Sequence, residues 1–384
     1  MMLIMKSSYG LVAVFICVML IMSIFAACGD GADNNSSVGG VESDVSSAPA
    51  ESVENTSSET VNSFENSAST VASLETVTSS TDASSTTASS SSAASSSASS
   101  SAEPVQTDRI QILGSIGGNG SLYKFNDNIY KLEIPFSGIY TSAFFIKLDD
   151  GSYCIIDTGS NSGDVANYVV PAAKTLGVNL YKVKGIMLTH THGDHTGGLS
   201  ALVTECPNAT VYGVNGSNAN VGANTYRQVS DGTQLMNVLK AVTIKGHDTD
   251  ACGYLDTRTN TLIAGDSLQL HGIASWGCQV RDVKAYLESM KKLQGMAIDN
   301  IFVAHAYVPT GAYAIGAAAV QKYIQDSIDC LNTLIEFTVD LYKAGVTDSN
   351  EIQKQYIAVM KETEPNFPKS GFDTAINAII RAYC

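Results

Sequence analysis

Four side chains of metal-binding types lie within six residues, directly after a short apolar run with the character of a β-strand. The segment reads Leu188-Thr189-His190-Thr191-His192-Gly193-Asp194-His195. Imidazole and carboxylate groups at this density suit Zn²⁺ or a comparable transition metal. A loop at a strand end can aim residues two and four positions apart at one point, and Gly193 is expected to relieve crowding there. The sequence therefore predicts a metal site at one edge of a β-sheet.

Three further candidate ligands also follow apolar runs of strand character, and they are His247, Asp266 and His305. The chain has only six histidines. Five of them stand at predicted strand ends, and the sixth is His271. Functional residues gather in loops that a rigid scaffold positions, so these strand ends are expected to deliver their side chains to one place.

From about residue 105 the sequence has the texture of an α/β domain, in which short apolar runs and helical stretches alternate. A DG turn within Asp149-Asp150-Gly151-Ser152 predicts a hairpin. Strands are predicted at 110–113, 129–134, 143–148, 153–156, 184–188, 210–212, 239–244, 252–255, 261–264 and 300–304. Helices are predicted at 165–176, 283–293, 317–343, 349–362 and 372–383. The expected catalytic domain is 105–310, and 311–384 is expected to be a helical C-terminal extension that covers one side of the site.

The N-terminal residues 1–27 have the layout of an export signal, with one charge at Lys6 and a long apolar stretch that ends in small residues. That stretch is also long enough for an uncleaved transmembrane anchor, which stays open as an alternative. Phe25-Ala26-Ala27-Cys28 is similar to a bacterial lipobox, in which the signal is cut before the cysteine and the cysteine receives a lipid. We therefore expect an exported protein, anchored to the cell membrane through Cys28 and facing outside the cytoplasm.

Residues 28–104 are rich in Ser, Thr and Ala and are expected to form a disordered tether, because they cannot bury enough apolar surface to offset chain entropy. Between Gly29 and Pro104 there are 11 acidic residues and no basic ones. The remainder from residue 105 keeps 26 acidic and 21 basic residues, a formal net charge of about −5. No basic stripe is present, so nucleic acid is not an expected partner.

Six cysteines follow Cys28, and no CxxC pair occurs. Outside the cytosol they could pair as disulfides in any of 15 ways, and the sequence does not choose among them. The alternative is that they are small buried hydrophobic residues, as expected for Cys154 inside its strand.

The order and spacing of the candidate ligands resemble the HxHxDH signature and the later GH, GD and H elements of the metallo-β-lactamase superfamily. The matching residues are His190, His192, Asp194, His195, Gly246-His247, Gly265-Asp266 and His305. The resemblance covers roughly residues 110–305. It implies an α/β fold, namely a four-layered αββα sandwich with the site at one edge of its two sheets.

The resemblance also implies a role for each residue. His190, His192 and His247 would hold one metal ion, Asp194, His195 and His305 a second, and Asp266 would bridge both. Asp157, in Asp157-Thr158-Gly159, would orient a ligand histidine, with a plain turn residue as the alternative. Asp194 and Asp266 would be the catalytic carboxylates. His271 and Tyr307 are possible substrate contacts, and a structural role is the alternative for each.

Two divalent ions of this kind, with Zn²⁺ expected first and Fe or Mn as alternatives, could share a hydroxide that attacks a small-molecule substrate. An ester, thioester, lactone or phosphodiester fits this reading, because a bridging Asp266 is typical of the glyoxalase II and lactonase-like branches. True zinc β-lactamases usually have Cys or Ser at that position. An iron-dependent oxidoreductase of the persulfide dioxygenase type, a β-lactamase and a non-catalytic surface protein stay open. Asp248 and Asp250 depart from the family's common pattern after His247, and their role is open.

Overall fold

The computed structural model describes residues 110–215 and 221–384. The predicted export signal, Cys28 and the predicted tether lie outside the described residues. Every element below belongs to one compact unit, Ala102–Cys384. Among the described residues, no helix combines the length and the apolar character needed to cross a membrane.

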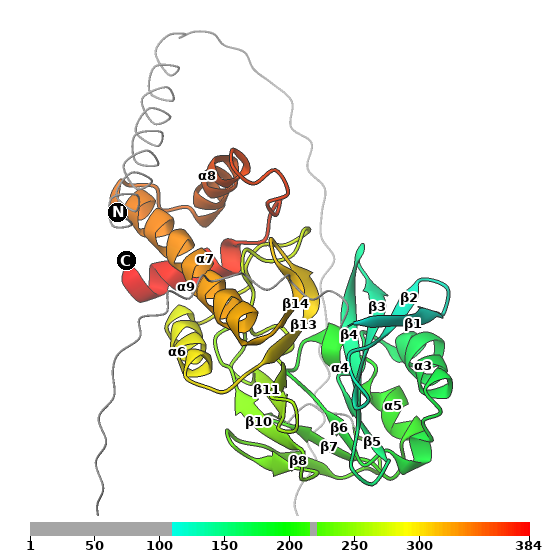
Figure 1. Ribbon diagram of the computed structural model, residues 1–384. Coiled ribbons are helices and arrows are strands. Elements are labelled where there is room, and N and C mark those ends of the chain that lie inside the picture. Colours follow the sequence, from blue (N-terminus) through cyan, green and yellow to red (C-terminus); the bar gives the residue numbers. More distant parts are fainter. Residues whose placement is uncertain (1–109, 216–220) are drawn as a thin grey trace, which may run out of the picture. The chain divides into compact units, whose positions relative to one another are not determined.

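The domain contains two β-sheets (Figure 1). The strands of the eight-stranded sheet are β1 (Gln111–Ile116), β2 (Gly120–Lys124), β3 (Ile129–Phe136), β4 (Ile139–Lys147), β5 (Tyr153–Ile156), β6 (Gly185–Met187), β7 (Thr210–Gly213) and β8 (Tyr226–Gln228). Those of the six-stranded sheet are β9 (Gln234–Leu235), β10 (Leu239–Thr243), β11 (Cys252–Asp256), β12 (Thr261–Ile263), β13 (Asn300–Tyr307) and β14 (Gly311–Ile315).

The two sheets follow simple topologies. In the first, neighbouring strands follow chain order, antiparallel from β1 to β5 and parallel from β5 to β8. In the second, the order is β14-β13-β12-β11-β10-β9, and only β12 and β13 run parallel. The predicted hairpin between β4 and β5 is confirmed, with Phe144 paired to Ile156 and Lys147 to Tyr153.

Helices cover the outer face of each sheet (Figure 1). The helical elements of the described residues are α2 (Ser162–Asp164), the π-helical segment η2 (Val165–Val169), α3 (Val170–Thr175), the 3₁₀ turn η3 (Leu180–Lys182), α4 (Gly193–Thr196), α5 (Leu199–Glu205), α6 (Val283–Gln294), α7 (Ala317–Lys343), α8 (Ser349–Lys361) and α9 (Asp373–Tyr383).

Two apolar cores show the layering. One lies between the sheets, where Phe144 and Ile156 of the first sheet pack with Tyr254 and Phe302 of the second. The other lies between the first sheet and its helices, where Ile186 packs with residues of η2, α3 and α5. On the far side, α7 contacts β13 and β14, and α6 and α9 contact α7. The predicted αββα sandwich is therefore confirmed.

The helical part after the sandwich follows its amphipathic pattern. The buried residues of α7 recur every three or four positions, as in Val320, Tyr323, Ile324 and Ser327, so one stripe of the helix faces the domain. α8 begins where the Asp348 carboxylate accepts a hydrogen bond from the amide of Glu351, which caps its first turn. The strand β14 belongs to the second sheet, so the helical extension begins at Ala317 and not at residue 311.

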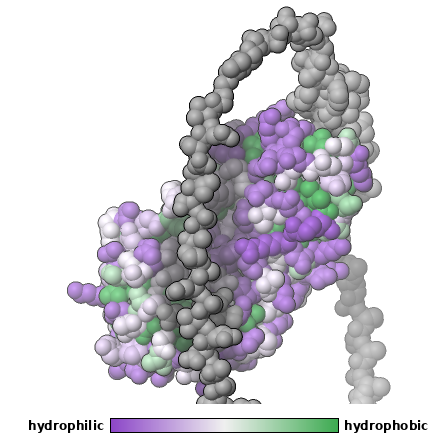
Figure 2. Space-filling model, turned by 180° about the vertical axis from the view of Figure 1, so that it is seen from behind, coloured by the Kyte–Doolittle hydropathy of each residue, from purple (hydrophilic) through white to green (hydrophobic). Residues whose placement is uncertain are grey.

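The sequence prediction also missed some local structure. The helix expected at 165–176 is preceded by α2 and divided into η2 and α3, because Pro171 has no amide hydrogen to continue an α-helical ladder. The strands β2, β8, β9 and β14 and the helix α5 were not predicted, since each is short or has few apolar residues. On the face seen in Figure 2, hydrophobic side chains form small separate groups among hydrophilic ones.

Candidate metal centre

Strand ends from both sheets supply the candidate ligands. The loop after β6 holds His190 and His192, and α4 carries Asp194 and His195. From the second sheet come His247 after β10, Asp266 after β12 and His305 within β13. All seven side chains predicted as ligands therefore meet at one edge of the sandwich.

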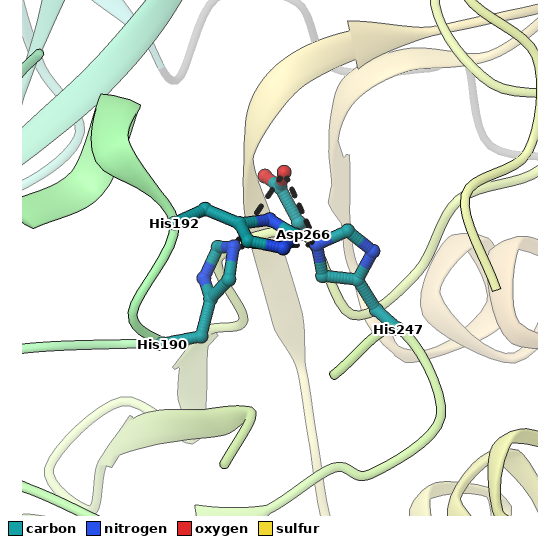
Figure 3. Close-up of side chains that lie close together, drawn as sticks. All are labelled: His190, His192, His247 and Asp266. Atoms are coloured by element: carbon teal, nitrogen blue, oxygen red, sulfur yellow. Dashed lines mark hydrogen bonds and ion pairs between the residues drawn. The ribbon is translucent and has the colours of Figure 1, made fainter. Parts of the chain in front are cut away.

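The seven residues form two groups that share one member. His190, His192, His247 and Asp266 have ligand atoms within 4.8 Å of one another, and so have Asp194, His195, Asp266 and His305. Figure 3 shows the side chains of the first group pointing toward a common centre. Asp266 is the shared residue.

The two oxygens of Asp266 face different groups. Its Oδ2 lies 3.7 Å from Nε2 of His247 and 4.0 Å from Nε2 of His190. Its Oδ1 lies 3.4 Å from Nε2 of His195 and 3.3 Å from Nε2 of His305. One carboxylate is thus placed to serve two centres at once.

The donor atoms fit metal ions. Ligand atoms on a tetrahedral zinc ion, at about 2.0–2.1 Å from it, are roughly 3.3 Å apart. Nε2 of His247 lies 3.2 Å from Nε2 of His190 and 3.0 Å from Nδ1 of His192. Among the described residues, Nε2 of His195 and Oδ1 of Asp266 are buried without any hydrogen-bond partner. Buried polar atoms rarely stay unpaired, so this cluster is built for a cation.

The imidazole tautomers agree with that fit. Nδ1 of His247 donates to the Gln279 carbonyl at 2.6 Å, and Nδ1 of His305 donates to the Tyr140 carbonyl at 2.6 Å. Each of these bonds leaves the lone pair on Nε2, the nitrogen that faces the cluster. The backbone therefore fixes both rings in the form that binds a metal.

Charge is distributed unequally between the two groups. Burial lowers the pKa of His190 well below its ordinary value and lowers the pKa of His247 to about 4, so both imidazoles are neutral. Burial alone would also lower the pKa of His305, but the charge of Asp266 and the hydrogen bond to Asp194 outweigh it and raise this pKa to about 9. The carboxylates thus favour a positive charge in the second group. A metal cation bound there would supply that charge and displace the proton from His305.

Asp157 holds His195 from behind. Its carboxylate accepts hydrogen bonds from Nδ1 of His195 at 2.8 Å, from the amide of Thr189 at 2.8 Å and from the Thr189 hydroxyl at 2.7 Å. Asp157 is 1% exposed and has a φ of 60°, a strained value for this residue type. These three bonds hold that conformation in place.

Asp248 and Arg281 flank the other side of the cluster. Oδ2 of Asp248 lies 3.2 Å from Nε2 of His192 and 3.0 Å from Nη1 of Arg281. Nη2 of Arg281 also lies 3.1 Å from this Nε2, so the Asp248–Arg281 pair engages Nε2, and Nδ1 of His192 is the nitrogen that faces the cluster, 3.0 Å from Nε2 of His247. Both oxygens of Asp250, by contrast, are buried without a partner in the described part of the chain, and the structure gives them no role.

Close backbone approach explains the glycines before two ligands. A Cβ on Gly246, which has φ 130°, would lie 2.4–2.7 Å from Tyr286. A Cβ on Gly265, which has φ 54°, would lie 2.6 Å from Oγ1 of Thr189. Only glycine therefore lets these turns bring His247 and Asp266 to the cluster.

The crowding expected at Gly193 is absent, because no described atom lies within 4 Å of a Cβ built there. It occurs instead at Gly197 and Gly198, where a Cβ would meet the backbone of Ser160 and Thr158 at 1.9 and 2.2 Å. These two glycines let α4 and α5 lie against the loop after β5. The local prediction was wrong because the approaching backbone comes from a distant part of the sequence.

Comparison with known proteins agrees with this geometry. The family model of the metallo-β-lactamase superfamily matches residues 137–305, a segment that contains all seven candidate ligands. Residues 137–305 of this chain belong to the metallo-β-lactamase superfamily.

Individual relatives share only part of the chain. The lactamase-like protein nscB of Arthroderma gypseum is 30% identical over 129 residues, which are 32% of this chain and 38% of that protein. The atrochrysone carboxyl ACP thioesterase of Emericella nidulans is 26% identical over 197 residues, 50% of this chain and 60% of that protein. This chain thus spans less than two thirds of the length of either relative.

Among solved structures, a double mutant of the sec-alkyl sulfatase PisA1 has a TM-score of 0.50 at 16% identity, covering 68% of this chain and 50% of that one. This likeness concerns the fold alone.

The two predicted substrate contacts have different surroundings in this metallo-β-lactamase domain. Tyr307 lines the cavity beside the cluster, is 2% exposed, and its hydroxyl has no hydrogen-bond partner among the described residues. His271 does not line that cavity. Its Nε2 lies 3.3 Å from Sγ of Cys330 and 3.5 Å from Oε1 of Glu364, so it joins the sandwich to the helical extension.

The six cysteines of the described chain are free thiols, so the structure contains none of the disulfides considered as one alternative. Cys154 is buried in β5, as the other alternative expected.

Sequence reasoning missed residues that hold the ligands. Gln269 donates to the Asp266 carbonyl at 2.9 Å and accepts from the Gln279 amide at 2.7 Å, and Gln279 in turn accepts from His247. Arg281 reaches Asp248 from the same loop. Nothing in the sequence signals these contacts, because they join residues 3 to 33 positions apart in irregular loops.

Proposed function

We propose that this protein is a metal-dependent hydrolase whose active site takes two divalent ions, with zinc the ion expected first. The observation that carries the proposal is the carboxylate of Asp266. Its two oxygens face two separate groups of imidazole and carboxylate ligands. A structural metal site would need only one closed group of four ligands.

When bound, the two ions would polarise the scissile bond and supply a water molecule of lowered pKa as the nucleophile. The chain's own residues hold and orient the reactants. Oδ2 of Asp194 lies 3.3 Å from Nε2 of His195 and 3.1 Å from Nε2 of His305. Asp194 and Asp266 are the carboxylates at the centre of the cluster, so they would hold the ions and orient the attacking water. The mechanism requires no serine or cysteine nucleophile.

The substrate class that we favour is a carboxylic ester or thioester, with a lactone or phosphodiester as further members of the set. Two curated relatives are named atrochrysone carboxyl ACP thioesterase, which supports an acyl substrate. Among the described residues, the side chains lining the cavity include no lysine or arginine. A cavity lining without cationic side chains suits an uncharged acyl group better than a phosphodiester.

A substrate panel together with metal analysis tests this proposal. The full chain should contain about two metal ions and should hydrolyse aryl esters or acyl thioesters. Turnover of bis-(p-nitrophenyl) phosphate alone would move the assignment to phosphodiesters, and turnover of a cephalosporin alone to β-lactamases. Iron as the bound metal with oxygen consumption on a persulfide would indicate the oxidoreductase. Metal binding without any turnover would contradict an enzymatic function.

The location is also proposed from sequence. The lipobox-like Phe25-Ala26-Ala27-Cys28 supports export and lipid attachment at Cys28, outside the cytoplasm. We predict that Cys28→Ala releases the protein from the membrane fraction or blocks its processing, as measured by fractionation and intact mass. Membrane retention with unchanged processing would leave only the transmembrane alternative.

A further inference from the structure

A cavity of about 360 Å³ opens beside the metal cluster, a size at the small end for small-molecule sites. The ligands His192, Asp194, His247, Asp266 and His305 form its inner side. Most of the rest of its lining comes from segments that supply no ligand. These segments therefore determine which substrates fit.

One wall of the cavity is a row of aromatic rings. The ring of Trp276 lies 6.0 Å from that of Phe136, and the ring of Phe136 lies 6.2 Å from that of His305. Both distances are in the range of favourable aromatic contact. Trp276 is 39% exposed, and Phe136 is half-buried at the end of β3. An apolar surface therefore leads from the mouth of the cavity to a candidate metal ligand.

The helical extension also lines the cavity and fixes the loop that carries Trp276. Thr374, at the start of α9, lines the cavity. The amide of Gly277 donates to the Ser370 carbonyl at 2.6 Å. A Cβ on Gly277 would lie 2.4–2.5 Å from the Phe372 ring, so the loop and the extension are in close contact. The exposed Trp276 is thus held over the cavity by residues far along the chain.

We propose that this aromatic wall, formed by Trp276 and Phe136, is a subsite for a flat, uncharged acyl group such as a benzoyl group. A large aromatic side chain that is kept exposed beside a reaction centre gains its contact area only when a ligand covers it. The inference rests on the proposed hydrolase function and adds the class of acyl group. It also assigns the helical extension a part in substrate selection.

Hydrolysis of matched thioesters tests the subsite. The benzoyl and acetyl thioesters of N-acetylcysteamine differ only in the acyl group. For Trp276→Leu we expect the ratio of kcat/KM for benzoyl over acetyl to fall about tenfold, because the benzoyl KM rises far more than the acetyl KM does. Trp276→Phe should keep most of the ratio, because it keeps an aromatic face. Tyr181→Leu, at another exposed aromatic residue that lines no part of this cavity, should leave the ratio unchanged.

Fluorescence separates failure of the subsite from failure of the proposed function. Trp276 is the only tryptophan of the chain, so tryptophan emission reports on this wall alone. Benzamide should change that emission saturably in the metal-free protein, and acetamide should do so only at far higher concentration. If neither thioester is hydrolysed, the proposed thioester substrate fails, yet the titration still decides the subsite. An emission insensitive to benzamide, or an unchanged ratio in Trp276→Leu, would overturn the subsite.

Discussion

Single carboxylates determine how the histidines of the cluster are held. Asp157 faces Nδ1 of His195, and Asp248 faces Nε2 of His192, so each fixes one ring through the nitrogen that points away from the cluster. Such outer partners usually affect metal affinity by about 10- to 100-fold. Asp248 further pairs with Arg281, which restrains it from the solvent side.

We predict that Asp248→Asn weakens binding of one metal ion by about tenfold, because an amide holds the His192 ring less firmly than a carboxylate does. Competition with a chromophoric chelator measures this affinity. Asp127→Asn, at an exposed turn, is the matched control and should leave it unchanged. An Asp248→Asn protein with the parent's affinity for both ions would remove Asp248 from this role.

At this level the sequence predicted the side chains that form the cluster and one of their supports, Asp157, but missed Gln269, Gln279 and Arg281. An apolar strand precedes each of His190, His247, Asp266 and His305, and this pattern can be read from the sequence alone. Asp248 was noticed without a role, since its partner Arg281 is 33 positions away.

Strands and turns place these residues, and glycines decide whether the turns can form. Gly265 lies between β12 and Asp266, and a Cβ atom on this residue would clash with the Thr189 side chain. Thr189 precedes His190 and bonds Asp157. The turn after β12 and the loop after β6 therefore fit together at one residue.

We predict that Gly265→Ala lowers the free energy of unfolding by about 1–3 kcal/mol, since it adds both a clash and a positive-φ strain. Denaturant unfolding measures this change. Gly295→Ala is the control, because Gly295 has an ordinary helical φ of −85° and its nearest contact is 3.5 Å away. Equal stability of Gly265→Ala and the parent would contradict the packing described.

Long apolar runs made most strands and the helices α6 to α9 predictable. Elements such as β2, β8 and β9 are stabilised by neighbours that the sequence does not bring near, so their own residues carry little signal. The four-layered architecture came from the resemblance of the motif to a known family and not from periodicity.

The described domain and its helical extension form one unit around the cavity, whereas the Ser-rich segment was predicted to be a tether. The compact unit begins at Ala102. The extension is part of the site, because Thr374 lines the cavity and His271 contacts both Cys330 and Glu364. Activity should thus depend on the C-terminal helices and not on the N-terminal segment.

We predict that a shortened chain beginning at Pro104 folds and keeps the kcat and metal content of the full chain. Circular dichroism, metal analysis and turnover of the best panel substrate check this. An insoluble or inactive shortened chain, with metal supplied, would show that the boundary between tether and domain is wrong.

Metal content of Asp266→Ala tests the two-centre account most directly. The change removes one oxygen from each group, but the first keeps His190, His192 and His247, a set of three imidazoles that suffices for zinc. We predict a folded protein that binds about one metal ion where the parent binds about two, with most hydrolysis lost. Elemental mass spectrometry gives the metal content, and circular dichroism controls for folding. A folded Asp266→Ala protein with unchanged metal content would contradict the assignment of Asp266 to both centres.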